Sequence, residues 1–146
     1  MITKYLEDQI QVLDTVGTWE ESIEVAAQQL LKKNYITPNY VKSMIENINT
    51  NGPYVVIMPE VAIPHSRPEE GAKKTTVSFL KINDAVSYPE GKMIKLIFVL
   101  AATDSDNHLE LISSLTDLLM DAEKVERLKD AKTVEEIKEI VRSVEV

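Results

Sequence analysis

Apolar residues recur every three or four positions in five parts of the chain, the spacing that places side chains on one face of an α-helix. Thr18 and Glu21 have capping-box spacing at the start of the first stretch, and Thr37 followed by Pro38 marks the start of the second. The pattern predicts helices over residues 18–33, 37–48, 106–121, 123–129 and 133–144. Amphipathic helices therefore lie at both ends of the chain, with a different pattern between them.

Strand patterns occupy the middle of the chain. Residues 54–58 are β-branched and apolar between turn residues, and residues 75–82 alternate as a half-buried strand does. Residues 95–102 form the continuous apolar run of a central strand, and the turn-rich residues 83–92 precede it. With helices at both ends and three or four strands between them, the sequence predicts a three-layer α/β domain whose sheet is covered on both faces.

Length, charge and composition narrow the class of protein. The chain has 146 residues, the size of one ordinary domain, and we expect residues 1–146 to form a single domain. Its 16 Lys and Arg against 24 Asp and Glu give a net charge of −8 without basic clusters, which argues against nucleic-acid binding. No apolar run approaches the roughly 20 residues of a membrane span, the N-terminus has no secretion signal, and Cys is absent. We expect a cytoplasmic protein without disulfides or direct membrane insertion.

The two histidines are the candidate functional residues. His65 follows Pro64, whose ring restricts the backbone where a strand-like segment ends, so its imidazole lies on a stiffened loop. His108 falls on the apolar face of the helix that begins near Asp106, directly after the strand over residues 95–102. Sites in α/β proteins form beyond the carboxyl ends of strands and near helix N-termini, so we expect the two rings to meet there. The alternatives are a loop histidine without a role and a capping histidine with one satisfied hydrogen bond.

Several chemistries use a pair of histidines. A metal site needs a third ligand, which Asp104, Asp106 or Glu60 could supply, but the sequence has no HxH or HExxH spacing. A serine hydrolase needs a nucleophile signature, and Ser66 is next to His65 in sequence, where it is poorly placed for activation. Nucleotide-binding fingerprints are missing, and the chain has only four glycines. We expect neither a metal nor a cofactor.

A histidine that attacks phosphorus remains. Neutral imidazole is a good nucleophile near pH 7, and a phosphohistidine passes its phosphoryl group onward. Phosphoryl transfer asks the protein for in-line positioning and for donors to the equatorial oxygens. His108, the hydroxyl of Ser66, the guanidinium of Arg67 and the first N–H groups of the following helix are donors of this kind. The constellation is coherent without being unique.

Two blocks of sequence carry a resemblance to a known family. AIPHSRPEEG, residues 62–71, and LIFVLAATDSDNHLELISSLTDLL, residues 96–119, resemble the enzyme IIA domains of the mannitol/fructose class in the phosphoenolpyruvate-dependent sugar phosphotransferase system. The A-I-P-H core is similar to the phosphoacceptor motif of that class, and the second block is similar to its second active-site histidine and helix. The HSRPEEG continuation looks most like the L-ascorbate type. The likeness extends over nearly the whole chain.

The resemblance implies a mixed central β-sheet between helical layers, that is, a three-layer α/β/α domain. It implies that His65 accepts a phosphoryl group from the histidine phosphocarrier protein and donates it to a IIB component on a separate chain, with His108 stabilising the phosphorylated state. A membrane IIC transporter would then take up and phosphorylate a sugar, L-ascorbate or a related compound. The alternative is a regulatory relative of the nitrogen type, whose phosphorylation state controls a partner protein.

Two positions depart from the family pattern. Glu60 stands where the family often has Gly, so it is strained if the backbone there takes a positive φ; otherwise its carboxylate orients the His65 ring or repels the phosphate. Mannitol-type members carry an active-site arginine in the preceding helix, where residues 44–51 here have no basic side chain. We expect Arg67 to replace that arginine.

Overall fold

The computed structural model describes residues 2–144, and within them five strands form one sheet. The strands are β1 (Ile10–Leu13), β2 (Val56–Met58), β3 (Glu60–Ala62), β4 (Thr76–Tyr88) and β5 (Lys92–Ala101). Their order across the sheet is β1-β4-β5-β3-β2. The β1–β4 and β3–β5 pairs are parallel, and the β4–β5 and β2–β3 pairs are antiparallel. The sheet is therefore mixed, as predicted.

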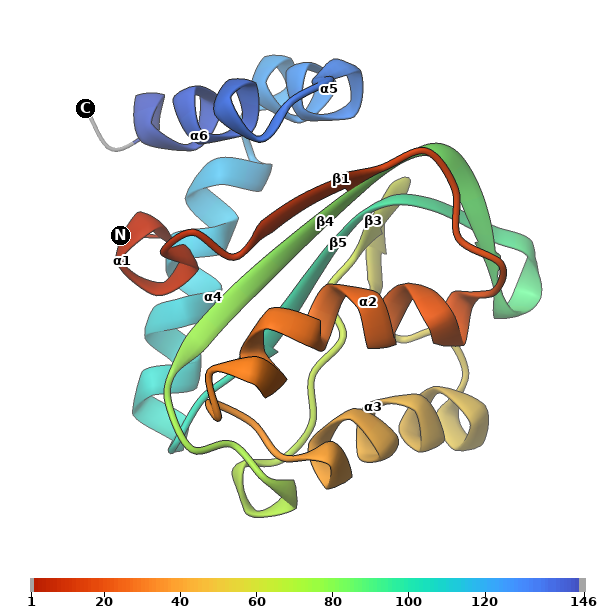
Figure 1. The fold of residues 1–146 in the computed structure, drawn as a ribbon, viewed down its shortest axis with the longest axis vertical. Helices are drawn as coiled ribbons and strands as arrows, with labels where there is room; N and C mark the ends of the chain where they lie inside the picture. Colours follow the sequence, from red (N-terminus) through yellow and green to blue (C-terminus); the bar gives the residue numbers. More distant parts are fainter. Residues whose placement is uncertain (1, 145–146) are drawn as a thin grey trace.

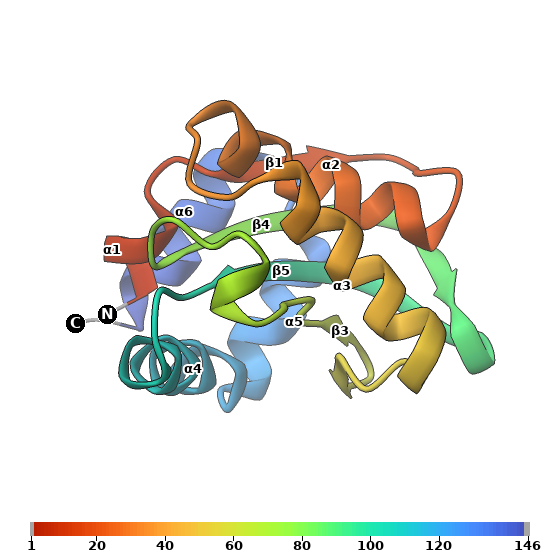
Figure 2. The same cartoon turned by 90° about the horizontal axis from the view of Figure 1, so that it is seen from below.

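Helices cover both faces of this sheet (Figures 1 and 2). They are α1 (Ile2–Leu6), α2 (Trp19–Lys32), α3 (Pro38–Asn51), α4 (Ser105–Leu119), α5 (Ala122–Asp130) and α6 (Val134–Ser143), with short 3-10 turns at Pro68–Glu70 and Pro89–Gly91. Helices α2 and α3 share one hydrophobic core with the sheet, and α1, α4, α5 and α6 share the other. The predicted three-layer α/β/α architecture is confirmed. The expected domain, residues 1–146, exceeds the described range by residues 1, 145 and 146.

The central strands are buried on both faces, which explains their continuous apolar sequence. Phe79 and Leu80 are adjacent in β4 and point to opposite faces, so each is fully buried in a different core. Phe79 stacks on Phe98 of β5 with ring centroids 4.3 Å apart. A strand without a polar face requires helices on both sides, and that requirement fixes the layered fold.

Helix starts agree with the predicted caps. The hydroxyl oxygens of Thr18, Thr37 and Thr133 each accept a hydrogen bond from the backbone N–H three residues later. Helix α4 begins one residue before the expected position, because Asp104 is the cap and accepts from the N–H of Asn107. The cap fixes the first turn of α4 a short distance along the chain from Ala101, where β5 ends.

The predicted number of strands, three or four, was too low. Strands β1 and β3 are four and three residues long and are held by pairing with longer neighbours, so they leave little local pattern. Residues 83–88 were assigned to a turn-rich segment but belong to β4, where a register shift between Lys81 and Val86 accommodates the polar residues. The strand expected over residues 54–58 begins only at Val56, because the N–H of Val56 closes a turn onto the carbonyl of Pro53.

Strands β3 and β5 run parallel and end at the same edge of the sheet. The chain leaves β3 into the segment that carries His65, and it leaves β5 into α4, whose first turn carries His108. The fold thus brings together two segments that are far apart in sequence. A search of residues 2–144 finds no helix with both the length and the apolar character needed to cross a membrane.

Candidate active site at the ends of β3 and β5

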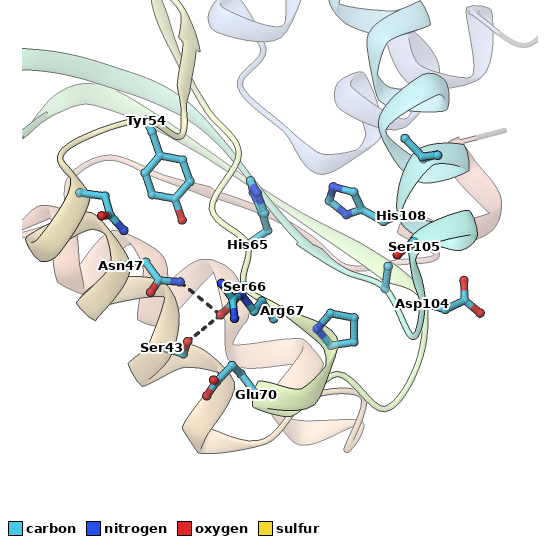
Figure 3. A pocket seen from close by; sticks show the side chains of 14 residues that line it. Ser43, Asn47, Tyr54, His65, Ser66, Arg67, Glu70, Asp104, Ser105 and His108 are labelled. Atoms are coloured by element: carbon cyan, nitrogen blue, oxygen red, sulfur yellow. Dashed lines mark hydrogen bonds between the residues drawn. The ribbon is translucent and has the colours of Figure 1, made fainter.

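The rings of His65 and His108 lie next to each other (Figure 3). Their centroids are 5.5 Å apart and the ring planes are inclined by 45°. Both side chains are partly buried. On the other side of His65 lies Tyr54, whose ring is in edge contact at 6.0 Å. The expected meeting of the two histidines is therefore present, and His65 lies between an imidazole and a phenol.

The His65 ring is oriented by its own backbone. Its Nδ1 atom lies 2.7 Å from the carbonyl oxygen of Ile63. A carbonyl oxygen only accepts hydrogen bonds, so Nδ1 carries the proton and Nε2 keeps its lone pair. The segment is fixed on both sides, because the N–H of Ile63 donates to Val55 and the N–H of Leu100 donates to Pro64. The ring nitrogen with a free lone pair is therefore Nε2, the one turned away from the backbone.

His108 projects from the first turn of α4 toward the same cavity. Burial lowers the pKa of His108, and the neighbouring His65 lowers it further by opposing a second positive charge. A neutral imidazole has one N–H to donate and one lone pair to accept. Near pH 7 His108 is thus mainly uncharged in the resting site. A bound anion would raise its pKa and favour the protonated form.

A cavity of about 690 Å³ opens beside the two histidines. It is lined by residues of α3, the His65 segment and the start of α4: Ser43, Asn47, Asn51, Tyr54, His65, Ser66, Arg67, Pro68, Glu70, Ala102, Asp104, Ser105, His108 and Leu109. The hydroxyls of Ser43 and Ser66 are hydrogen-bonded at 2.6 Å, and the amide of Asn47 donates to the Ser66 hydroxyl at 3.3 Å. Ser66, a predicted site residue, therefore joins α3 to the His65 segment.

Arg67, the other predicted binding residue, lines the cavity and is exposed. Among the described residues that line the cavity it is the one Arg or Lys side chain. The two carboxylates in the lining are already engaged: Glu70 accepts from the side chain of Asn39, and Asp104 caps α4. Arg67 is thus the permanent positive charge available to an anion bound here.

Several residues around the site have no counterpart in the sequence predictions, among them Ser43, Asn47, Asn51, Tyr54 and Tyr40. Ser43, Asn47 and Asn51 are spaced four residues apart on α3, so they form a polar row beside its apolar face. That row could have been found from the spacing alone. Tyr40 is fully buried, and no local pattern reveals that its hydroxyl serves a loop far along the chain.

Glu60 has a structural place outside the site. Its φ is 69°, so the carboxylate side chain stands on left-handed backbone of the kind that favours glycine, as one of the two expectations stated. The carboxylate pairs with Lys129 of α5 at 3.1 Å. The two alternatives, a carboxylate that orients His65 or repels the phosphate, apply only if φ is not positive, so they do not arise here, and Nδ1 of His65 lies against the Ile63 carbonyl.

The metal alternative finds no ligand set in the described part of the chain. Across residues 2–144, no group of three or more His, Asp or Glu side chains is arranged to hold a metal ion. Of the ligands considered from sequence, Asp104 is occupied as a helix cap and Glu60 as an ion-pair partner. The two histidines face a cavity whose lining combines neutral hydrogen-bonding groups, one arginine and the two engaged carboxylates of Glu70 and Asp104.

Comparison with known proteins identifies the family to which the chain is similar. Residues 5–144 match the family model described as "Phosphoenolpyruvate-dependent sugar phosphotransferase system, EIIA 2". The chain is 37% identical over 136 residues to the mannitol-specific cryptic phosphotransferase enzyme IIA component of Escherichia coli K12, covering 92% of each chain. It is 29% identical over 127 residues to the ascorbate-specific PTS system EIIA component of the same strain, covering 85% of this chain and 82% of that one.

Solved structures show the same fold. The solution structure of the mannitol-specific cryptic enzyme IIA from Escherichia coli matches with a TM-score of 0.92 at 35% identity and covers 97% of this chain and 98% of its own. The enzyme IIA chain in the Escherichia coli complex of IIA-mannitol with phosphorylated IIB-mannitol matches with a TM-score of 0.81 at 28% identity. The match covers 94% of this chain and 96% of that one. The nitrogen regulatory protein IIA-Ntr from Neisseria meningitidis matches with a TM-score of 0.78 at 25% identity. The match covers 96% of this chain and 98% of that one.

Proposed function

The chain belongs to the EIIA 2 family of the phosphoenolpyruvate-dependent sugar phosphotransferase system, and from this premise we propose that His65 carries the phosphoryl group. Members of this family are phosphotransferase components of sugar transport that work through phosphohistidine intermediates. We further propose that residues 1–146 form one such domain and that it works in the cytoplasm, where phosphoenolpyruvate is available.

The 2.7 Å contact between Nδ1 of His65 and the carbonyl oxygen of Ile63 is the observation that carries the proposal. With the proton held on Nδ1 by the Ile63 carbonyl, Nε2 attacks phosphorus and forms the new N–P bond. The P–N bond of the donor phosphohistidine breaks, and the donor imidazole leaves with that electron pair. The His65 ring then carries a positive charge, which the Ile63 carbonyl stabilises through the proton on Nδ1. No proton has to move during the transfer, so the same step can run in reverse when a phosphoryl acceptor replaces the donor.

The second histidine and the polar lining would hold the transferred group. His108 donates a hydrogen bond to a phosphate oxygen, and the incoming negative charge raises the pKa that burial and His65 hold down in the resting state. Ser66 and Arg67 line the same cavity as His65 and His108 and supply a hydroxyl and a cation. These donors keep the phosphoryl group in line for attack from either direction.

The proposed partners are two proteins that use the same surface in turn. The histidine phosphocarrier protein would deliver the phosphoryl group, and a IIB component on a separate chain would receive it, as the complex of IIA-mannitol with phosphorylated IIB-mannitol suggests. Exposed apolar side chains flank the cavity, Tyr54 at 45% and Leu109 at 66% exposure. Such a rim suits transient docking, and the membrane IIC transporter would be reached only through IIB.

The sugar is the finer part of the proposal. L-ascorbate was expected from the sequence, and an ascorbate-specific component is indeed among the relatives, but the mannitol-specific relative shares more of the sequence, 37% against 29%. We therefore propose uptake of mannitol, L-ascorbate or a related polyol. Because phosphate passes between proteins at this site, the sugar is selected by the partner proteins. Transfer assays with mannitol-type and ascorbate-type IIB and IIC partners would separate the two sugars by rate.

A regulatory role is the second candidate. The fold match to the nitrogen regulatory protein IIA-Ntr supports it, at lower identity than the match to the mannitol-type structure. In that case phosphorylated and unphosphorylated forms would differ in affinity for a partner protein, and no IIB component would accept the phosphate. Rapid loss of phosphate to an added IIB component favours transport, and a stable phosphoprotein that binds a partner favours regulation.

The test is phosphorylation by a reconstituted system. The purified chain is incubated with phosphoenolpyruvate, enzyme I and the histidine phosphocarrier protein, and its intact mass is followed. We expect one acid-labile phosphoryl group, lost in His65→Gln and retained in His108→Gln, so each histidine variant controls for the other. Two-dimensional NMR of the phosphorylated protein should assign the phosphate to Nε2 of His65. A normal mass gain in His65→Gln would overturn the proposal.

A further inference from the structure

The hydrogen-bond ladder between β3 and β5 is interrupted at His65. Ala62 is paired with Ile97, so continuing the parallel register by three residues places His65 opposite Leu100. The N–H of Leu100 donates to the carbonyl of Pro64 at 3.0 Å, as a parallel ladder requires. The next ladder bond would run from the N–H of Ser66 to the carbonyl of Leu100. That bond is replaced by a side chain.

The hydroxyl of Tyr40 takes the place of the missing bond. The N–H of Ser66 donates to the Tyr40 hydroxyl at 3.0 Å, and the hydroxyl donates to the carbonyl of Leu100 at 2.7 Å. The carbonyl of Ser66 lies 3.2 Å from the same hydroxyl. Two hydrogen bonds in series therefore span a gap that one bond spans in a regular ladder, so the segment after His65 stands farther from β5 than a paired strand would.

The residues around the gap, Pro64 and Tyr40, both favour the interruption of the ladder. Pro64 has no N–H to offer to β5, so the ladder is already weakened one step before His65. Tyr40 reaches the gap from the first turn of α3 and is fully buried there, with 0% of its surface exposed. Burial raises the pKa of Tyr40 to about 12, so the phenol keeps the proton that it donates. The Tyr40 hydroxyl is therefore held in place between Ser66 and Leu100.

We propose that Tyr40 is a positioning residue whose hydroxyl, inserted between Ser66 and Leu100, holds His65 away from β5 and sets its distance from His108. Leu100 lies just before the turn that leads into α4, so the same hydroxyl connects the two segments that carry the histidines. For its effect on transfer, this inference rests on the proposed phosphorylation of His65. For its effect on the geometry of the loop, it rests on the hydrogen bonds alone.

The test compares Tyr40→Phe with Tyr88→Phe. Tyr88 is a matched control: it is also buried, and its hydroxyl is hydrogen-bonded at 2.7 Å to the hydroxyl of Ser22, outside the site. Both variants lose one buried hydroxyl and should melt at lower temperature. Only Tyr40→Phe should slow phosphorylation by the phosphocarrier, by about 10- to 100-fold in kcat with little change in KM, because the docking surface is intact and the nucleophile is displaced.

Two NMR readouts do not depend on transfer. In Tyr40→Phe, the Ser66 amide should lose protection from hydrogen exchange, and the titration midpoint of His108 should shift because its distance to His65 changes. Tyr88→Phe should leave both unchanged. If the unsubstituted protein takes up no phosphate, the proposed function fails, while these readouts still decide the role of Tyr40.

A measurement on the unsubstituted protein covers the case in which Tyr40→Phe does not fold. The Tyr40 hydroxyl proton should appear as a slowly exchanging resonance with a nuclear Overhauser contact to the Ser66 amide proton. Absence of that resonance would overturn the inference. So would a folded Tyr40→Phe with normal kcat, a protected Ser66 amide and an unshifted His108.

Discussion

The ring of His108 lies next to the ring of His65, so a charge on one ring acts directly on the other. The ring centroids are 5.5 Å apart, so a proton on one imidazole raises the cost of a proton on the other. Burial lowers the pKa of His108 most, and His65 adds to that effect. A phosphoryl group on Nε2 of His65 would place negative charge beside His108 and raise the pKa of His108. His108 is thus mainly uncharged near pH 7 before transfer, and the phosphoryl group favours its protonated form afterwards.

The first prediction concerns the titration of His108. Its NMR midpoint in the unphosphorylated protein should lie below the ordinary histidine value of about 6.5. In His65→Ala the midpoint should rise only part of the way back, since the charge effect of His65 is removed and burial remains. On phosphorylation of the native protein it should rise above its resting value. A midpoint that does not move in either experiment would contradict the pairing.

Acid stability follows from the same shift. Because the pKa of His108 is lower in the folded than in the unfolded chain, the unfolded chain binds the proton first as pH falls below about 6.5. The free energy of unfolding should therefore decrease from that pH down to the folded-state pKa and lose nothing further from this group below it. Urea titrations at several pH values would give the slope of the unfolding free energy against pH. That slope should be shallower in His108→Gln than in the native protein. Equal slopes in these two proteins would contradict a lowered pKa for His108.

Replacement of His108 should separate uptake of phosphate from its release. In His108→Ala the Nε2 lone pair of His65 is still available, so the phosphocarrier should still phosphorylate the protein. Transfer to the IIB component should be slower, because a donor that holds the phosphoryl group in line is missing. Rapid-quench measurement of both half-reactions would test this, with His108→Gln expected to recover part of the rate by restoring an N–H donor. Complete loss of uptake in His108→Ala would argue that His108 is needed earlier.

Much of the fold was predictable because long amphipathic elements and their caps are local features. Threonine caps at 18, 37 and 133 and the apolar run over residues 95–102 mark elements that the structure contains. The short strands were not predictable, because β1 exists by virtue of its parallel pairing with β4. The same holds for the left-handed Glu60 and for the polar residues inside β4, which depend on irregular pairing of the strands.

The site was half predictable for a related reason. His65, Ser66, Arg67 and His108 lie on two short motifs whose chemistry is visible in sequence, and the structure brings them to one cavity. Part of the remaining lining, Ser43, Asn47 and Asn51, comes from α3, which reaches the site only through tertiary packing. Tyr40 is the clearest case, because its side chain is buried like any core residue while its hydroxyl bonds to the loop beside His65. A pattern of polar and apolar positions cannot distinguish these two uses of a tyrosine.

The charge of Arg67 should govern how much phosphate the site holds. A charge-assisted hydrogen bond contributes about 1.5–3 kcal/mol, so Arg67→Gln should lower the equilibrium ratio of phosphorylated to free protein by roughly 10-fold or more. Arg67→Lys should recover part of the loss, since it restores the charge without the planar guanidinium. Arg127→Gln, in α5, is a matched control outside the cavity. Equal phosphorylation of Arg67→Gln and the native protein would assign phosphate binding to the neutral lining alone.

Glu60 offers a test of backbone strain separate from chemistry. Glu60→Ala and Glu60→Gly both lose the ion pair with Lys129, but only Ala keeps a Cβ on backbone with a φ of 69°. The Gly variant should therefore be more stable than the Ala variant by about 1 kcal/mol. At the exposed helical position Glu139 in α6 the order should reverse, because glycine costs a helix interior about 0.5–1 kcal/mol relative to alanine.

Thermal and urea unfolding of the four variants would establish both orders. Phosphorylation should proceed at the native rate in both Glu60 variants, because the carboxylate is paired with α5 and the His65 ring is held by the Ile63 carbonyl. A lower transfer rate in Glu60→Gly and Glu60→Ala alike would mean that the carboxylate acts on the site after all. A lower rate in only one of them would instead mean that the backbone at residue 60 sets the path of the chain into His65.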